Sequence, residues 1–159
     1  MTSSKIKIRK ATIKDVPKIV SLIGTFAKQG QMLKRKPEEI VLNLRDFFVA
    51  VKPRSKTVLG CASLHLYTDR LSEIKALAVR QSARNLGVGK RLISRCLREA
   101  KALGLPRVFV LTYIPDFFVK LGFVPSNKEL LPEKIWIECA KCAKQHNCTE
   151  NCLVYLLPR

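Results

Sequence analysis

Residues 71–92 read LSEIKALAVRQSARNLGVGKRL, and this stretch decides the fold. Its first part, Leu71 to Val79, is apolar and alternating, which predicts a strand. Gly87 and Gly89 follow, and apolar residues then recur at helical spacing over residues 88–103. The stretch therefore predicts a strand, a glycine-bearing loop and a long helix in immediate succession.

The loop at residues 84–89 has the character of an anion-binding site. A helix begins with unpaired backbone N–H groups and a partial positive charge, and glycines let an anion approach the backbone closely. Four basic residues add formal charge there: Arg80, Arg84, Lys90 and Arg91. A tight turn before a helix is the simpler interpretation of a lone Gly-x-Gly. The spacing is not that of a P-loop, which would need a Gly-Lys-Ser/Thr ending. It is also not that of a dinucleotide-binding Gly-x-Gly-x-x-Gly motif, because position 92 is leucine.

The rest of the chain alternates between strands and helices without a linker or an internal repeat. Strands are expected at residues 5–10, 47–52, 57–67, 107–113, after Phe123 and at 153–157, and helices after the Thr12–Asp15 capping signal, after Pro37 and at 115–120. Strict alternation in the central strand places Glu73, Lys75, Leu77 and Val79 on one face and Ile74, Ala76 and Ala78 on the other. We expect one α/β domain over residues 1–159, with the cysteine-containing segment 136–159 as part of it.

The composition narrows the class of protein. The chain has 159 residues, of which 30 are Lys or Arg and 12 are Asp or Glu, giving a net charge of +18. The basic residues are spread over the whole chain instead of forming one stripe, so nucleic acid is not an expected partner. No apolar run is long enough to cross a membrane and the N-terminus lacks a signal core, so we expect a cytoplasmic protein.

Two motifs resemble those of the GCN5-related N-acetyltransferase (GNAT) family. Arg84, Gly87 and Gly89 match its Gln/Arg-x-x-Gly-x-Gly/Ala signature. Residues 117–123, FFVKLGF, are similar to its Phe-Tyr-x-Lys-x-Gly-Phe segment. The resemblance implies a mixed, mostly antiparallel sheet flanked by helices, whose splayed central strands hold acetyl-CoA as cosubstrate.

The same resemblance implies which residues hold the cosubstrate. The backbone at Leu77 and Val79 would bind the pantetheine arm, and residues 86–90 would bind the pyrophosphate. The full set implied is Leu77, Ala78, Val79, Arg84, Leu86, Gly87, Val88, Gly89, Lys90, Phe117 and Phe118.

Acetyl transfer to an amine needs a base that removes the ammonium proton and a proton for the departing thiolate. Glu73, near the start of the central strand, is the candidate base; the alternative is a surface glutamate paired with Lys75 or Arg70. The family often uses the tyrosine of its second motif as the acid, but position 118 is phenylalanine. Tyr113 is the candidate replacement, although a strand-end tyrosine is commonly a core residue with its hydroxyl in water.

A finer resemblance is to short N-acetylglutamate synthases, which act in arginine biosynthesis. It rests on residues 31–35, 73–79, 111–113 and 131–142. It implies L-glutamate as the acceptor, with Arg35 and Lys134 binding its carboxylates; Arg35 could equally be a solvated arginine in a basic stretch. Another amine (a polyamine, a protein lysine or an N-terminus), or a weakly catalytic acetyl-CoA-binding module docking on an acidic partner, is the alternative. A homodimer is left open.

Four cysteines near the C-terminus form a last cluster. Cys139, Cys142, Cys148 and Cys152 could hold zinc, remain reduced, or form disulfides, and their irregular spacing does not decide among these. Cys61 and Cys96 lie within strand and helix patterns and are expected to be small core residues.

Overall fold

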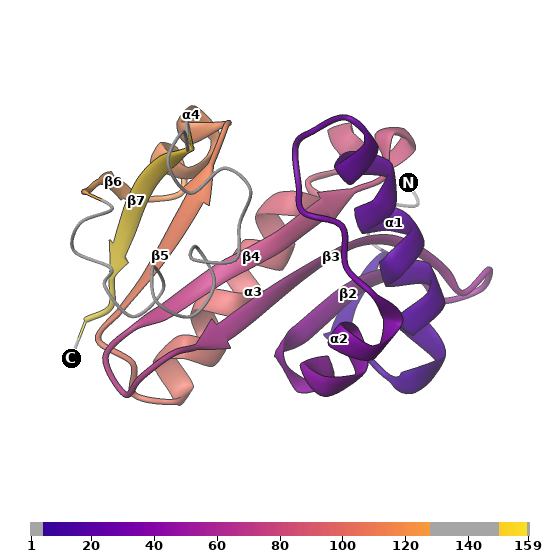
Figure 1. Ribbon diagram of the computed structural model, residues 1–159, viewed down its shortest axis with the longest axis horizontal. Helices are drawn as coiled ribbons and strands as arrows, with labels where there is room; N and C mark the ends of the chain where they lie inside the picture. Colours follow the sequence, from indigo (N-terminus) through magenta and orange to yellow (C-terminus); the bar gives the residue numbers. More distant parts are fainter. Residues whose placement is uncertain (1–4, 128–149, 159) are drawn as a thin grey trace. The chain divides into compact units, whose positions relative to one another are not determined.

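The computed structural model describes residues 5–127 and 150–158, and its elements follow the predicted order (Figure 1). They are β1 (Lys7–Lys10), η2 (Ile13–Asp15), α1 (Val16–Lys28), α2 (Pro37–Leu42), η3 (Leu44–Asp46), β2 (Phe47–Lys52), β3 (Thr57–Leu66), β4 (Ser72–Val79), η4 (Gln81–Leu86), α3 (Val88–Ala102), β5 (Arg107–Thr112), α4 (Pro115–Val119), β6 (Val124–Pro125) and β7 (Asn151–Leu156), where η marks 3-10 helices. The strands form a seven-stranded sheet in the order β1-β2-β3-β4-β5-β7-β6. The predicted α/β class, a mostly antiparallel sheet flanked by helices, is confirmed.

The chain groups into two compact units. The first unit comprises Met1–Leu64 and Ile74–Glu99, and the second comprises His65–Glu73 and Ala100–Arg159. The assignment of residues 1–159 to one domain stays a prediction. Within the described residues, no helix is both long and apolar enough to cross a membrane.

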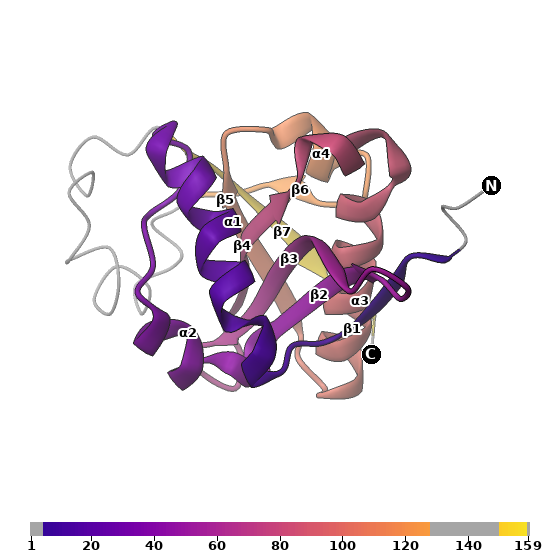
Figure 2. The same ribbon diagram turned by 90° about the vertical axis from the view of Figure 1, so that its right-hand side faces the viewer.

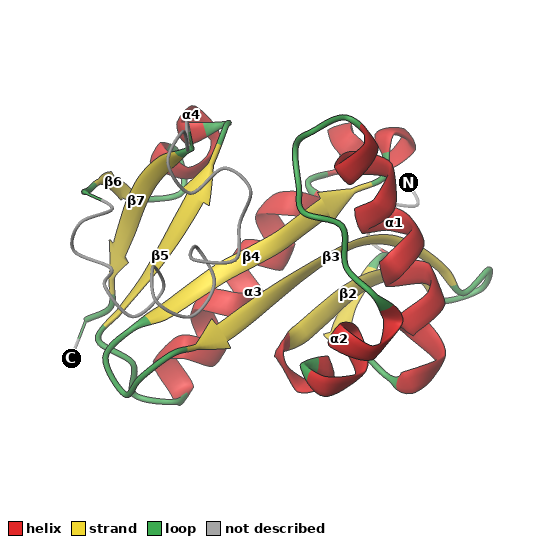
Figure 3. Ribbon diagram, in the orientation of Figure 1, coloured by secondary structure: helices red, strands yellow, loops and turns green. Residues whose placement is uncertain are grey.

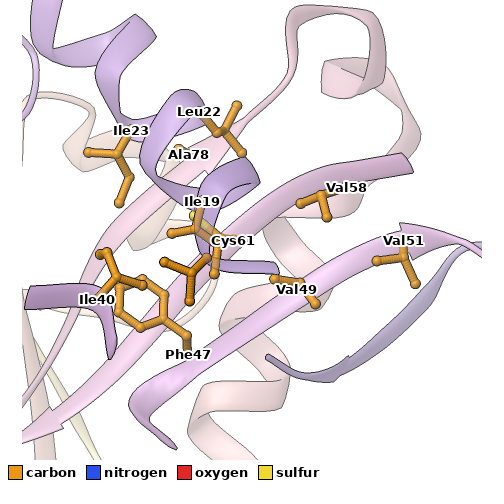
Figure 4. Packing of buried hydrophobic residues seen from close by; sticks show 11 residues of the cluster. Ile19, Leu22, Ile23, Ile40, Phe47, Val49, Val51, Val58, Cys61 and Ala78 are labelled. Atoms are coloured by element: carbon orange, nitrogen blue, oxygen red, sulfur yellow. The ribbon is translucent and has the colours of Figure 1, made fainter. Parts of the chain in front are cut away.

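The core of the first unit lies between its strands and α1. β1, β2 and β3 pair in antiparallel order, and α1 with α2 covers one face of β2 and β3 (Figure 2). Ile19 and Ile23 of α1 are fully buried in one cluster with residues of the strands, and Ile19 lies beside Cys61 of β3 (Figure 4). Burying each such aliphatic side chain contributes about 1.5–3 kcal/mol. The predicted apolar face of the first helix therefore anchors this unit.

The other face of these strands carries α3, and a glycine permits the close approach. A Cβ at Gly60 would lie 3.0 Å from the carbonyl oxygen of Ala78 and within 3.2 Å of the Val88 and Leu92 side chains. Any larger residue there would push α3 away from β3. The first turns of α3 are thus seated tightly against the sheet.

The central strand β4 departs from the predicted strict alternation. Ser72, Glu73 and Ile74 are all buried in succession, and Ala76 has a φ of 57°. A left-handed residue in a strand breaks the two-residue period, because the side chains after it change phase. The prediction that the side chains of residues 73–79 alternate without interruption between two faces is therefore wrong.

The second unit is built on the antiparallel pair β5 and β7, with β6 on the far side of β7 and the short α4 near one end (Figure 3). Buried Leu71, Phe109 and Cys152 form its small core, with Tyr67 packed against them. β4 contributes Glu73, which pairs in parallel with Phe109 of β5. The separation of these two strands beyond that pair, implied by the family resemblance, stays a prediction.

Candidate functional site

The glycine loop joins β4 to α3 as the sequence predicts, with one refinement. Residues 81–86 form the 3-10 helix η4, which ends at Gly87 with a φ of 72°. α3 starts at Val88, whose side chain is fully buried, and the Arg91 N–H donates to the Gly87 carbonyl at 3.1 Å. The left-handed glycine therefore turns the chain from one helix directly into the other.

This geometry leaves the N-terminus of a 15-residue helix beside an exposed glycine. A Cβ built on Gly87 would meet no heavy atom within 4 Å, so the space in front of the loop is open. The backbone N–H groups of the first helical turn have no acceptor one turn earlier in the helix, and they carry partial positive charge. The arrangement can bind an anion such as a phosphate.

A hollow of about 310 Å³ lies in the first unit between α1 and the segment that leads into the loop. It is lined by Lys18, Ser21, Leu22, Thr25, Phe26, Gln29, Val58, Val79, Arg80, Gln81, Ser82 and Arg84. Three of these residues are basic and none is acidic. The Arg84 guanidinium lies over the Phe26 ring at 5.8 Å, which fixes its position beside the hollow. The hollow suits a polar, anionic group.

The α1 residues of the hollow were not predicted as site residues, although the sequence holds a signal for them. Lys18, Leu22, Thr25 and Gln29 fall at helical spacing on one stripe of α1. The sequence does not reveal what this stripe faces, and the structure shows that it faces residues 79–84.

Glu73 lies at the start of β4 in the second unit and is 3% exposed. The Tyr67 hydroxyl donates a hydrogen bond to its Oε1 at 2.7 Å. The alternative of a surface glutamate is therefore wrong. Tyr67 was not predicted from the sequence as a site residue. Its contact with Glu73 depends on the turn between β3 and β4, and no sequence motif indicates it.

Tyr113 directly follows β5 in the same unit and is 39% exposed. Its neighbour Thr112 is buried, and the Thr112 hydroxyl accepts a hydrogen bond from the Ile114 N–H at 2.9 Å. That bond fixes the turn that presents Tyr113 to solvent. An exposed tyrosine here is compatible with either of the two roles considered from the sequence.

The second family motif forms an aromatic cluster around α4. Phe118 is 4% exposed, with its ring 5.1 Å from that of Phe117 and 5.3 Å from that of Phe123, both edge to face. Phe118 is thus a packing residue of the second unit, and its contact with a cosubstrate stays a prediction.

Arg35 lies just before α2 and forms an ion pair with Glu39 at 3.7 Å. Its side chain is 24% exposed, so it is held near the surface by a helical partner. Lys134, the other predicted carboxylate ligand, lies outside the described residues.

Among the predicted zinc ligands, Cys139, Cys142 and Cys148 lie outside the described residues, and Cys152 is buried in β7. In the described parts of the chain, no three His, Cys, Asp or Glu side chains gather as a metal site. The zinc hypothesis thus has no support there. Cys61 and Cys96 are fully buried, as predicted, and burial raises the pKa of each thiol to about 12.

Comparison with known proteins places this arrangement in a wider context. The model of the acetyltransferase (GNAT) family matches residues 21–123. An uncharacterized N-acetyltransferase of Chlorobaculum tepidum is 36% identical over 157 residues, which are 99% of this chain and 100% of that protein. The amino-acid acetyltransferase of Escherichia coli K12 is 33% identical over 129 residues, 80% of this chain and 29% of that protein.

Two crystal structures are similar over nearly the whole chain. N-acetylglutamate synthase from Neisseria gonorrhoeae, complexed with coenzyme A and N-acetyl-glutamate, has a TM-score of 0.86 at 28% identity, covering 97% of this chain and 35% of that one. A protein of Mycobacterium tuberculosis in complex with CoA has a TM-score of 0.81 at 27% identity, covering 96% and 99%. This chain therefore spans about a third of the length of the synthase.

Proposed function

Because the chain belongs to the acetyltransferase (GNAT) family, we propose that it transfers the acetyl group of acetyl-CoA to the α-amino group of an amino acid, with L-glutamate as acceptor. The observation that carries the donor half of this proposal is the loop of η4, Gly87 and α3. An open helix N-terminus with a left-handed glycine and surrounding basic side chains suits the pyrophosphate of a coenzyme A thioester.

The residues proposed to hold acetyl-CoA are those of the loop and of the end of β4. The N–H groups of the first turn of α3 receive the pyrophosphate, and Lys90 adds positive charge at the exposed surface. Leu77 and Val79 offer backbone groups to the pantetheine arm. Arg84 is held over Phe26 and supplies a guanidinium to the phosphates.

Glu73 is proposed as the general base. Its carboxylate takes a proton from the substrate ammonium, and the neutral amine then attacks the thioester carbonyl. The tetrahedral intermediate collapses with cleavage of the carbon–sulfur bond, and the second amine proton is released as the thiolate takes up a proton. Tyr113 is the proposed donor of that last proton. Burial of Glu73 excludes water from around the carboxylate, which favours direct proton transfer.

The choice of glutamate as acceptor rests on the relatives. The amino-acid acetyltransferase matches 80% of this chain with 29% of its own length. The N-acetylglutamate synthase matches 97% of this chain with 35% of its own length. Arg35 is proposed to bind a carboxylate of the acceptor, for which it would exchange its long 3.7 Å contact with Glu39 for a bidentate bond. Lys134 is proposed as its partner.

One assay tests the acceptor. The protein is incubated with acetyl-CoA and a panel of glutamate, glutamine, aspartate, polyamines and a lysine peptide, and the products are identified by mass spectrometry. We expect N-acetylglutamate to dominate. Acetylation of another amine in place of glutamate would change the proposed acceptor but support the acetyltransferase activity. If no amine of the panel is acetylated, an acetyl-CoA-binding module is favoured.

A second assay tests the base. Glu73→Gln keeps the size and the hydrogen-bond acceptor but removes the basicity, so we expect kcat to fall by about 100-fold or more. Glu38→Gln, on the exposed surface of α2, is the control for the loss of one carboxylate charge. Unchanged turnover of Glu73→Gln between pH 6 and 9 would show that another group is the base.

A further inference from the structure

The turn between β3 and β4 holds a tyrosine directly against the proposed base. We propose that Tyr67 is a positioning residue for acetyl transfer: its hydroxyl fixes the orientation of the Glu73 carboxylate so that the carboxylate meets the substrate ammonium. This proposal rests on the proposed function, because it requires Glu73 to act as the base.

The first observation is the bond itself. The Tyr67 hydroxyl lies 2.7 Å from Oε1 of Glu73, a short distance typical of a hydroxyl that donates to a carboxylate. Glu73 is almost fully buried, so its carboxylate oxygens need hydrogen-bond donors from the protein in place of water. Tyr67 supplies one such donor through a rigid ring that has only two side-chain rotations.

The second observation is that the turn between Tyr67 and Glu73 is held by its own hydrogen bonds. The Tyr67 N–H donates to the Leu71 carbonyl at 2.9 Å, which closes the turn two residues before Glu73. The Thr68 hydroxyl accepts from the N–H groups of Arg70 and Leu71 at 3.1 and 3.0 Å. The turn is therefore a set of mutual hydrogen bonds and not a loose connection.

The third observation is that Phe109 of β5 adjoins both residues. Phe109 is the β5 residue that pairs with Glu73 in the sheet. Its ring also stacks on that of Tyr67, with centroids 6.2 Å apart and an angle of 20°. The His65 and Tyr67 rings form an edge-to-face pair with centroids 4.8 Å apart. The strand that positions the Glu73 backbone thus also positions the ring whose hydroxyl holds the Glu73 side chain.

A structural role would account for both the stacking and the hydrogen bond, because buried carboxylates are normally hydrogen-bonded, so the two roles differ in their kinetic consequences. Since Tyr67 does not receive the proton itself, its removal should affect the rate of the chemical step and leave the binding of both substrates intact. Holding the Glu73 carboxylate at a fixed angle to the substrate ammonium would speed the reaction by orienting the reacting groups.

The test uses Tyr67→Phe, which removes the hydroxyl and keeps the stacked ring. We expect kcat to fall about 10-fold while KM for acetyl-CoA and for the acceptor stay within about twofold. Tyr155→Phe, in β7 of the same unit, is the matched control, because Tyr155 packs on Phe123 and takes no part in the proposed reaction. It should keep the wild-type kcat.

A double-mutant cycle separates positioning from packing. If Tyr67 acts through Glu73, Tyr67→Phe should cost less than about twofold in a Glu73→Gln background. A wild-type kcat for Tyr67→Phe, or an equal loss in both backgrounds, would overturn the inference and leave the transferase activity in place. A wild-type protein that acetylates no amine would overturn the proposed function and this inference with it.

Discussion

Asp15 is a buried carboxylate of the first unit that is held by several hydrogen-bond donors. It is 3% exposed and accepts hydrogen bonds from Arg9 at 2.7 and 3.1 Å and from the Thr12 N–H at 2.7 Å. Burial alone would raise the pKa of its carboxyl, but these donors outweigh burial and lower it. The pair therefore stabilises the folded protein while Asp15 is ionised.

We expect Asp15→Asn to lower the free energy of unfolding by about 2 kcal/mol at pH 7, measured by denaturant titration, because hydrogen bonds to a charged group are lost. A folded-state pKa below the ordinary 3.8 gives stability that is complete above pH 3.8 and is lost as the pH falls through the lowered value. The difference between wild type and variant should therefore shrink in acid. Glu39→Gln, in a surface pair, should change stability by less than about 0.5 kcal/mol at either pH.

The two buried thiols lead to a prediction about reactivity. With a pKa raised to about 12 by burial, Cys61 and Cys96 are almost wholly protonated at pH 8, and only thiolates react rapidly with alkylating reagents. We expect peptide mass spectrometry to find neither residue alkylated by iodoacetamide in the native protein and both alkylated in guanidinium. Native labelling of either at the unfolded rate would show that its surroundings open to solvent.

At the scale of elements, the loop before α3 offers a test of backbone conformation. Gly87→Ala places a Cβ on a residue with a φ of 72°, which should cost about 1 kcal/mol of stability. The same Cβ enters the open space where the pyrophosphate is proposed to lie, so we expect coenzyme A to bind about 10-fold more weakly by calorimetry.

Two further glycines act as controls for that substitution. Gly104, with a φ of 79° beyond α3, should lose comparable stability on replacement by Ala but keep its affinity for coenzyme A. Gly24→Ala lies inside α1 with open space around the new methyl, and it should stabilise by about 0.5–1 kcal/mol. Equal affinities in Gly87→Ala and Gly104→Ala would show that the loop does not bind the cosubstrate.

Elements with a clear period were predictable from the sequence. α1 and α3 carry apolar stripes ended by glycine, and β2 with β3 flank a turn, so local preferences alone place them. The 3-10 helix η4 and the phase change at Ala76 were not predictable. A left-handed alanine is unfavourable locally and forms only because the rest of the sheet imposes it.

The candidate site shows the same division. The glycine loop follows from sequence because its chemistry lies in consecutive residues. Tyr67 beside Glu73, and Lys18 and Phe26 beside residues 79–84, depend on contacts that the fold creates between separate elements. The periodicity and motifs of a single sequence do not show which residues of separate elements come into contact.

At the scale of the whole molecule, the net charge of +18 should act mainly on the donor. Acetyl-CoA carries several phosphate charges, and three of the residues that line the hollow in the first unit are basic with no acidic neighbour in that lining. Attraction between exposed charges is screened over about 10 Å at 0.1 M salt and over about 3 Å at 1 M. We expect KM for acetyl-CoA to rise several-fold between 50 mM and 500 mM KCl with kcat nearly constant, because salt weakens encounter and not chemistry.

The acceptor offers the internal comparison for this salt effect. Glutamate carries far less charge than acetyl-CoA, so its KM should change by less than about twofold over the same range of KCl. Lys18→Gln and Arg80→Gln together should reduce the salt dependence of KM for acetyl-CoA if those residues provide the attraction. An unaltered dependence in the double variant would place the attraction in the general surface charge, and a KM independent of salt would show that the basic residues do not guide the donor.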